Sequence, residues 1–193
     1  MSGTFPWYVA RAAGLVSWAQ LAAATLWGLA LSTRALGDRP RANWLLDVHR
    51  WLGGTALAFT GVHVVALLAD QYVHFSVVEI LVPFTSSWQP VAVAWGVVAA
   101  YLLLAVEVTS LARNRLSKRA WRRVHTASFV LFVFATIHGL TAGTDTRSVM
   151  ARTLALAVGT VFAGLTAIRL ADVQRLAPAP SPHRGRREMP VRR

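Results

Sequence analysis

Four of the six histidines lie inside long apolar stretches of the sequence, namely His49, His63, His125 and His138. A polar, titratable side chain is costly within the hydrocarbon of a membrane, so a histidine in such a stretch is a candidate functional residue. Two of the four lie in one stretch and two in another, at similar spacing. Their type and spacing predict a pair of ligand sites that the two stretches share.

The composition predicts that a membrane protein carries these histidines. The chain has 193 residues, of which 55% are hydrophobic and 15% are charged, and this is too apolar for an ordinary soluble domain. The net charge of +12 does not indicate nucleic acid, because the basic residues form short clusters between apolar stretches. The absence of cysteine excludes disulfides, zinc–thiolate sites and iron–sulfur ligation.

Five apolar stretches approach the length of about 20 residues that a helix needs to cross a bilayer. This predicts an all-α integral membrane protein with about five transmembrane helices in one bundle. Residues 1–11 are expected to form an N-terminal segment, 12–172 the membrane domain, and 173–193 a disordered basic tail. A signal peptide is the competing interpretation of the first stretch, which is long for one. The five helices are predicted at about 12–31, 44–69, 91–111, 124–142 and 149–168.

The basic residues are distributed unevenly over the connections between these helices. Residues 32–43 contain three arginines, residues 113–123 six basic residues and the tail from Arg169 seven, whereas residues 70–90 contain none. Cytoplasmic loops of membrane proteins carry an excess of lysine and arginine. The distribution therefore predicts an N-terminus outside the cell, a C-terminus in the cytoplasm and a multi-pass protein of the plasma membrane.

In this topology the second and fourth helices run in the same direction, so the depths of their histidines can be compared. His63 follows His49 by 14 residues, about 21 Å of helix, and His138 follows His125 by 13 residues, about 19.5 Å. The pairs His49/His125 and His63/His138 are therefore nearly level. At about 100° per residue, His63 returns to within about 40° of the face of His49, but His138 lies about 140° from that of His125. The fourth helix must bend, or its histidines approach their sites from different sides.

Paired imidazoles on facing helices can occupy both axial positions of a haem iron, and helical bundles commonly hold cofactors in this way. No iron position then remains for oxygen or substrate, which favours electron transfer. Two haems stacked across a hydrocarbon core of about 30 Å would divide the crossing into shorter steps. Gly53, Gly61 and Gly139, close to the histidines in sequence, either let a flat macrocycle approach the backbone or only permit close helix packing.

The histidines stand within short motifs, which include His49-Arg50-Trp51-Leu52-Gly53 and Trp121-Arg122-Arg123-Val124-His125. Further motifs are Val82-Pro83-Phe84, Glu107-Val108-Thr109-Ser110 and His138-Gly139-Leu140-Thr141-Ala142-Gly143-Thr144-Asp145. Together with the spacings of 14 and 13, they resemble the ferric reductase-like transmembrane domain over about residues 12–172. NADPH oxidases, ferric reductases and the haem-binding membrane subunit of the bacterial methionine-sulfoxide reductase system share this domain. The resemblance implies two b-type haems, an inner one ligated by His49 and His125 and an outer one by His63 and His138, that move electrons across the membrane.

The larger relatives continue into a flavin- and nicotinamide-binding module, whereas only about twenty residues follow the last helix here, without a glycine-rich dinucleotide fingerprint. The resemblance therefore implies a bacterial membrane electron-transfer component of an oxidoreductase system. Its donor is expected to be a separate cytoplasmic flavoprotein or membrane quinol, and its acceptor to be extracytoplasmic. One alternative is a haem-free helical membrane protein, such as a metal-ion permease or a structural partner subunit. Another is a quinol-linked haem subunit of a periplasmic enzyme.

Several charged residues near the histidines have two interpretations. Arg50, Arg122 and Arg123 flank the inner histidines, where they either bind haem propionates or extend to the membrane surface as topology markers. Asp47 and Glu107 either pair with neighbouring arginines or line a proton or quinone pocket. No nucleophile–base pair and no paired carboxylates are apparent, so no catalytic side chain is predicted.

On the outer side, Asp70, His74 and Glu79 lie between the second and third helices. They either gather a ferric ion or another acceptor, or belong to a solvated loop or surface-lying helix, since residues 72–81 are partly amphipathic. His74 is also a substitute ligand if the fourth helix cannot present both of its histidines.

Overall fold

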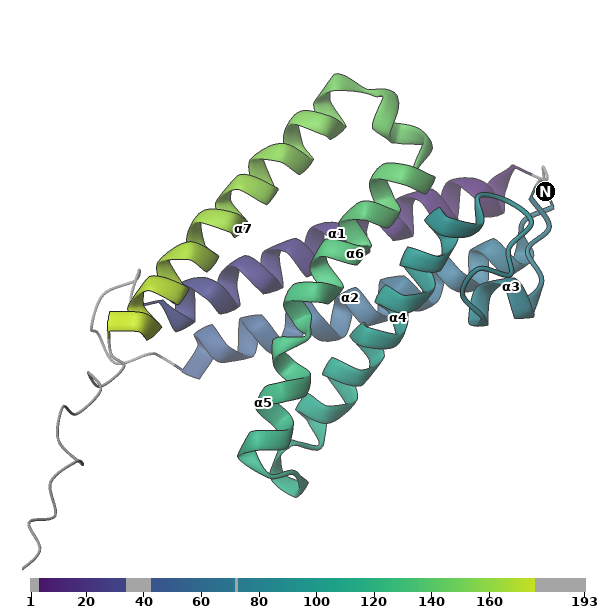
Figure 1. Ribbon diagram of the computed structural model, residues 1–193. Coiled ribbons are helices and arrows are strands. Elements are labelled where there is room, and N and C mark those ends of the chain that lie inside the picture. Colours follow the sequence, from purple (N-terminus) through teal and green to yellow (C-terminus); the bar gives the residue numbers. More distant parts are fainter. Residues whose placement is uncertain (1–3, 34–42, 72, 176–193) are drawn as a thin grey trace, which may run out of the picture.

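The computed structural model describes residues 4–33, 43–71 and 73–175 (Figure 1). Five helical segments in this part of the chain are long and apolar enough to cross a membrane, and the same part contains no strand. The prediction of an all-α membrane protein with five spans is confirmed. In chain order the elements are α1 (Phe5–Ser32), α2 (Asn43–Ala69), α3 (Val77–Leu81), α4 (Pro90–Leu111), η1 (Arg113–Arg115), α5 (Lys118–Thr126), α6 (Ser128–Ala142), η2 (Thr144–Arg147) and α7 (Val149–Arg175).

Three helix boundaries differ from the sequence prediction, and one of them is the start of α5 at Lys118, six residues before the predicted 124. Helix α1 begins at Phe5, inside the predicted N-terminal segment, with Pro6 in its first turn, where a missing amide hydrogen costs nothing. Helix α7 continues to Arg175, beyond the predicted start of the tail. The rest of that tail, residues 176–193, and the arginines predicted to mark the first cytoplasmic loop lie outside the described residues.

Small and weakly polar residues bring α1 and α2 together as an antiparallel pair (Figure 1). Ala56 of α2 is fully buried against α1, and the hydroxyl of Ser17 donates to its carbonyl at 3.0 Å. The same hydroxyl lies 2.7 Å from that of Thr60. Small residues permit close approach of helices in lipid, and side-chain hydrogen bonds add to the association. This pairing fixes the registry of α1 against the histidine-bearing helix α2.

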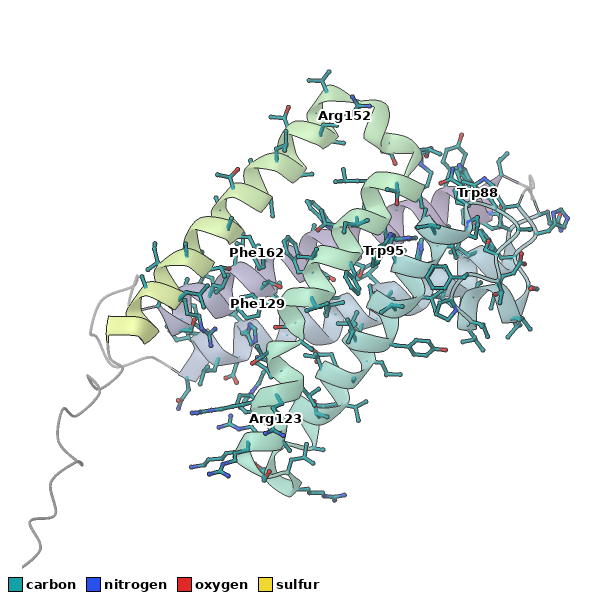
Figure 2. The ribbon with its side chains drawn as sticks, in the orientation of Figure 1. Trp88, Trp95, Arg123, Phe129, Arg152 and Phe162 are labelled. Atoms are coloured by element: carbon teal, nitrogen blue, oxygen red, sulfur yellow. The ribbon has the colours of Figure 1, made fainter. Side chains whose placement is uncertain are left out.

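Helix α6 packs along α4, and α7 joins this pair through aromatic side chains (Figure 2). Trp95 of α4 lies 4.7 Å from Phe134, measured between ring centroids. Phe162 of α7 contacts Phe129 and Phe132 of α6 with centroid distances of 5.7 and 4.9 Å. Phe162 also packs against the buried core, whose residues come from α1, α2, α4 and α6 and are Leu21, Ala22, Ala56, Ala99, Leu103, Leu131 and Phe132.

The predicted fourth helix is divided into α5 and α6 by a turn at Ala127. The amide of Ala127 donates to the carbonyl of Val124 at 2.9 Å, three residues back, so the chain turns more tightly here than in an α-helix. This turn lies between His125 and His138. It resolves the spacing problem, because the two histidines no longer belong to one straight helix.

The bundle has two distinct ends. The end that carries α5 is basic and includes the start of α2 and the end of α4, and Figure 2 shows Arg123 extending from it. The opposite end carries the start of α1 and the short helix α3 (Figure 1). A hydrogen bond of 2.6 Å from the hydroxyl of Tyr101 to the carbonyl of Leu81 attaches α3 to α4. We refer to these as the α5 end and the α3 end.

Candidate functional site

The four histidines face one another in two pairs, one toward each end of the bundle. The ring centroids of His49 and His125 are 5.9 Å apart, and their planes are inclined by 71°. Those of His63 and His138 are 6.3 Å apart, with an inclination of 78°. The structure thus brings together the pairs expected from sequence depth. We call them the inner pair, nearer the α5 end, and the outer pair.

Three of the four imidazoles are held by backbone carbonyls. Nδ1 of His49 donates to the carbonyl of Ala24 at 3.1 Å, and Nδ1 of His63 donates to that of Ala10 at 2.8 Å. Nδ1 of His138 likewise donates to a carbonyl, that of Ala92, at 2.8 Å. Because a carbonyl can only accept, the proton of the neutral ring lies on Nδ1 and Nε2 is left free. A metal-ligating histidine typically uses its second nitrogen in this way, which fixes the tautomer and the ring orientation.

A glycine lies beside each of these three imidazoles. A Cβ atom at Gly14 would lie 3.0 Å from Nδ1 of His63, and one at Gly28 would lie 3.1 Å from Cε1 of His49. At Gly96 the added atom would lie only 2.7 Å from two atoms of the His138 ring. The missing side chains therefore let the rings reach the backbone carbonyls.

These three glycines were not singled out from the sequence, although a signal was present. Each follows the accepting alanine by four residues, so one Ala-x-x-x-Gly pattern recurs at residues 10–14, 24–28 and 92–96. Gly14 and Gly28 are also 14 residues apart, the spacing of His49 and His63. On antiparallel helices, equal spacings place both contacts at matching heights.

The glycines that lie near the histidines in sequence have other surroundings. A side chain at Gly53 would collide with the carboxylate of Glu107, so this glycine permits close packing of α2 and α4. A Cβ atom at Gly61 or Gly139 would meet no atom within 4 Å. Neither of the last two is needed for approach of another helix in the described parts of the chain.

The two pairs have the dimensions that a six-coordinate haem iron requires. Two imidazoles bound to one metal through bonds of about 2 Å hold their ring centroids roughly 6 Å apart. A porphyrin supplies the remaining four ligands, so two protein ligands are sufficient. No group of three or more His, Asp or Glu side chains within residues 4–33, 43–71 and 73–175 could hold a bare metal ion. The donor set therefore fits a haem better than a protein-only metal site.

The outer pair lines an apolar cavity of about 310 Å³ between the helices. Gly14 and Gly96 also line it, and the ion pair of Arg11 with Asp145 lies at its wall. Nε of Arg11 donates to Oδ2 of Asp145 at 3.2 Å, and a second hydrogen bond joins its NH2 group to Oδ1. This pair links α1 to η2, and it was not foreseen from the sequence.

The charged residues predicted near the inner pair do not gather around the imidazoles. Arg50 forms an ion pair of 3.2 Å with Asp47, and these side chains are 67% and 66% exposed. Arg123 is exposed on α5 (Figure 2), as is Arg122. Glu107 lies against Gly53 and forms no ion pair within the described residues. Pairing with an arginine is thus found for Asp47 and not for Glu107, and propionate binding by Arg50 and Arg123 stays a prediction.

The acidic residues of the α3 end have structural partners. Both oxygens of Glu79 are engaged, since the amides and hydroxyls of Ser76 and Ser87 donate to them at 2.8–2.9 Å. The hydrogen bonds from the backbone of Ser76 and then of Ser87 lower the pKa of Glu79 to about 2. Asp70 is buried and accepts from the amide of Val73, while His74 is exposed. These contacts favour the surface-helix interpretation over a ferric-ion site.

Comparison with known protein families gives a match over much of the chain. The family model described as "Ferric reductase like transmembrane component" matches residues 13–136. The matched range includes His49, His63 and His125 and the three ring-contacting glycines, and it ends two residues before His138. No curated protein and no solved structure gives a match to the chain.

Proposed function

Because the chain belongs to the ferric reductase like transmembrane component family, whose role is membrane electron transfer, we propose that it is a bis-haem b electron-transfer subunit of the plasma membrane. The inner pair, His49 with His125, would hold one haem, and the outer pair, His63 with His138, the other. The observation that carries the proposal is the presence of two imidazole pairs with centroid distances of 5.9 and 6.3 Å. Each haem, when bound, would supply an iron that takes up and releases one electron.

The residues of this chain prepare both sites for that group. The carbonyls of Ala24, Ala10 and Ala92 hold three rings with Nε2 free, and they increase the basicity of the ligand nitrogen. The glycines beside these rings leave no Cβ atom in their way. Fixed ligands of this kind reduce the rearrangement that accompanies a change in iron charge.

The distribution of charge supports a direction of transfer. The α5 end carries exposed basic side chains, and cytoplasmic surfaces of membrane proteins are enriched in such residues. The inner pair would therefore receive electrons from a separate cytoplasmic flavoprotein or from quinol. The outer pair, beside its cavity at the α3 end, would pass them to an extracytoplasmic acceptor.

The interior between the two pairs argues against a metal-ion permease. Leu21, Ala56 and Leu131 lie midway between the inner and outer residues on their helices and form one buried apolar core with Leu103 and Phe132. An ion would need a continuous series of polar groups to cross this region. Electrons have no such requirement, so the apolar separation is compatible with electron transfer.

The proposal is tested by an absorption spectrum of the purified protein in detergent, oxidised and dithionite-reduced, with haem quantified per chain. We expect two low-spin b haems per chain in the unmodified protein. His49→Ala and His63→Ala should each retain one, and His74→Ala should retain both. Absence of haem after expression with ample haem supply would refute the proposal and favour a haem-free membrane protein.

The donor is tested on the haem-loaded protein with NAD(P)H and a purified flavoprotein reductase, and separately with a quinol. Reduction of the haem by the first system identifies a flavoprotein donor, and reduction by the second identifies a quinol donor. Failure of every flavoprotein to reduce the haem, while quinol succeeds, would exclude the flavoprotein version.

A further inference from the structure

His125 differs from the other three histidines in how its ring is held. Its Nδ1 is buried but has no hydrogen-bond partner among the described residues. The ring stacks on Trp121, with a centroid distance of 4.9 Å and an angle of 19° between the planes. The guanidinium of Arg113 lies 5.0 Å from the centroid of Trp121. Stacking thus fixes the plane of the ring while its donor remains unsatisfied.

The difference between His125 and the other three histidines can be traced to α4. This helix places a glycine and an accepting carbonyl beside the outer pair, but not beside the inner pair. On α1, Gly14 contacts His63 of the outer pair, and Gly28, fourteen residues later, contacts His49 of the inner pair. On α4, Gly96 contacts His138 of the outer pair, and the residue fourteen positions later is Ser110. Fourteen residues return a helix to within about 40° of the same face. Ser110 therefore occupies the inner position that a glycine occupies on α1.

Ser110 carries a hydroxyl oxygen that can accept a hydrogen bond, and Nδ1 of His125 can donate one. Its Oγ is buried and, like Nδ1 of His125, has no hydrogen-bond partner in the described segments. Helix α4 packs against α5, which carries His125 and Trp121. Nε1 of Trp121 is a third buried atom without a partner in this part of the chain. An imidazole and an indole N–H are donors, and a serine oxygen can accept.

Buried polar groups in proteins are almost always hydrogen-bonded, and an ordered water commonly satisfies several of them at once. We propose that Ser110 is a positioning residue of the inner site, whose hydroxyl receives the Nδ1–H of His125 through one bridging water. It replaces the backbone carbonyl used by the other three histidines. The proposal rests on the function proposed above, because it concerns a hydrogen bond to an imidazole that would ligate the inner haem.

A hydrogen bond to the outer nitrogen of a ligating imidazole makes the ligand more basic and favours the ferric iron. Loss of the Ser110 hydroxyl should therefore raise the reduction potential of the inner haem. A lost hydrogen bond of about 1 kcal/mol corresponds to a change of roughly fivefold in an equilibrium constant. We expect the ratio of reduced to oxidised inner haem at a fixed potential to rise about fivefold to tenfold, where tenfold is about 59 mV for one electron.

The experiment is a spectroelectrochemical titration of Ser110→Ala in full-length protein that also carries His63→Ala, so that only the inner haem is observed. Electron paramagnetic resonance of the oxidised protein reports the axial ligands independently. Ser110→Thr, which keeps the hydroxyl, should restore the original potential. Thr109→Val is the matched control, because the Thr109 hydroxyl already donates to the carbonyl of Ala105 at 2.7 Å. It should leave the potential unchanged.

An unchanged inner potential in Ser110→Ala, or an equal shift in Thr109→Val, would overturn the proposal. If Ser110→Ala loses the inner haem, retention in both Ser110→Thr and Thr109→Val would support a requirement for the hydroxyl. Loss in Ser110→Thr as well would indicate a steric effect and overturn it. If the unmodified protein binds no haem, the proposed function fails. If it binds two and Ser110→Ala changes nothing, only this inference fails.

Discussion

The imidazole of His49 packs so closely against the backbone of Gly28 that a Cβ atom at this glycine would lie 3.1 Å from Cε1 of the ring. The same relationship recurs between Gly14 and His63 at 3.0 Å. Both contacts join α1 to α2 and bring the ring nitrogen to an alanine carbonyl one turn earlier on α1. Helix α1 contributes no histidine to either pair, but it sets the orientation of one imidazole in each.

Replacement of Gly28 by leucine should remove the inner haem and leave the outer one. A leucine side chain would fill the space of the His49 ring and prevent its hydrogen bond to Ala24, whereas the outer pair lies about 21 Å away along the helix. Haem quantified per chain should fall from two to one. Gly164→Leu on α7 is the matched control, because a Cβ atom there meets nothing within 4 Å. Two haems in Gly28→Leu would contradict the prediction.

A single methyl group should be sufficient to weaken the outer site when it is added at Gly96. The new atom would lie 2.7 Å from the His138 ring, so the ring must move and its hydrogen bond to Ala92 must lengthen. Loss of such a partner typically reduces metal affinity by about 10–100-fold. The effect is measured as the rate at which the outer haem is lost when excess apo-protein is added to capture the released haem.

Gly139→Ala is the comparison for Gly96→Ala, since Gly139 follows His138 directly in sequence but has open space around it. It should bind haem normally. Equal losses from the two variants would mean that proximity in sequence, rather than contact across helices, determines the effect.

The positions of the spans and the pairing of the histidines could be predicted from the sequence. Span length follows from the thickness of the bilayer, and depth follows from the rise per residue. The 13-residue spacing of His125 and His138 predicts a bend in the fourth helix as one of two alternatives, but its position at Ala127 could not be predicted, because residues 124–129 contain neither proline nor glycine. Both α5 and α6 pack against α4, so tertiary contacts surround this turn.

The contacts between the glycines and the histidines also could not be predicted from the sequence, for a physical reason. In a membrane, the side of a helix that faces lipid is as apolar as the side that faces the core, so the sequence does not indicate which helix lies opposite which. Gly53 and Gly139 are close to histidines along the chain, whereas Gly14 and Gly96 are close to them in space. The spacing of 14 residues that Gly14 and Gly28 share with His49 and His63 has a structural meaning only once α1 is known to pack against α2.

The ion pair of Arg11 with Asp145 should stabilise the wall of the outer cavity. It joins residues 134 positions apart, and its side chains are only about a third exposed (34% and 35%). We expect Asp145→Asn to lower the free energy of unfolding by about 1 kcal/mol, measured as a fall in the midpoint of thermal unfolding in detergent.

The control for Asp145→Asn is Asp47→Asn, whose pair with Arg50 is two-thirds exposed and should contribute almost nothing. The charge exchange Arg11→Asp with Asp145→Arg should recover part of the lost stability. The prediction fails if Asp145→Asn and Asp47→Asn lower the midpoint equally.

The segment around α3 should lose local stability in acid because of Glu79. The carboxylate accepts hydrogen bonds from Ser76 and Ser87, and its pKa in the folded protein is lowered from 4.5 to about 2. A lowered pKa means that the unfolded segment binds the proton more readily, so the stabilisation is complete above about pH 4.5 and is lost as the pH falls toward 2. Amide hydrogen-exchange protection at Ser76 and Ser87, corrected for intrinsic rates, should therefore decrease between about pH 6 and pH 3. Glu79→Gln should show low protection that does not vary with pH, since the amide cannot titrate. Constant protection in the unmodified protein, or the same pH dependence in Glu79→Gln, would assign the acid sensitivity of this segment to another group.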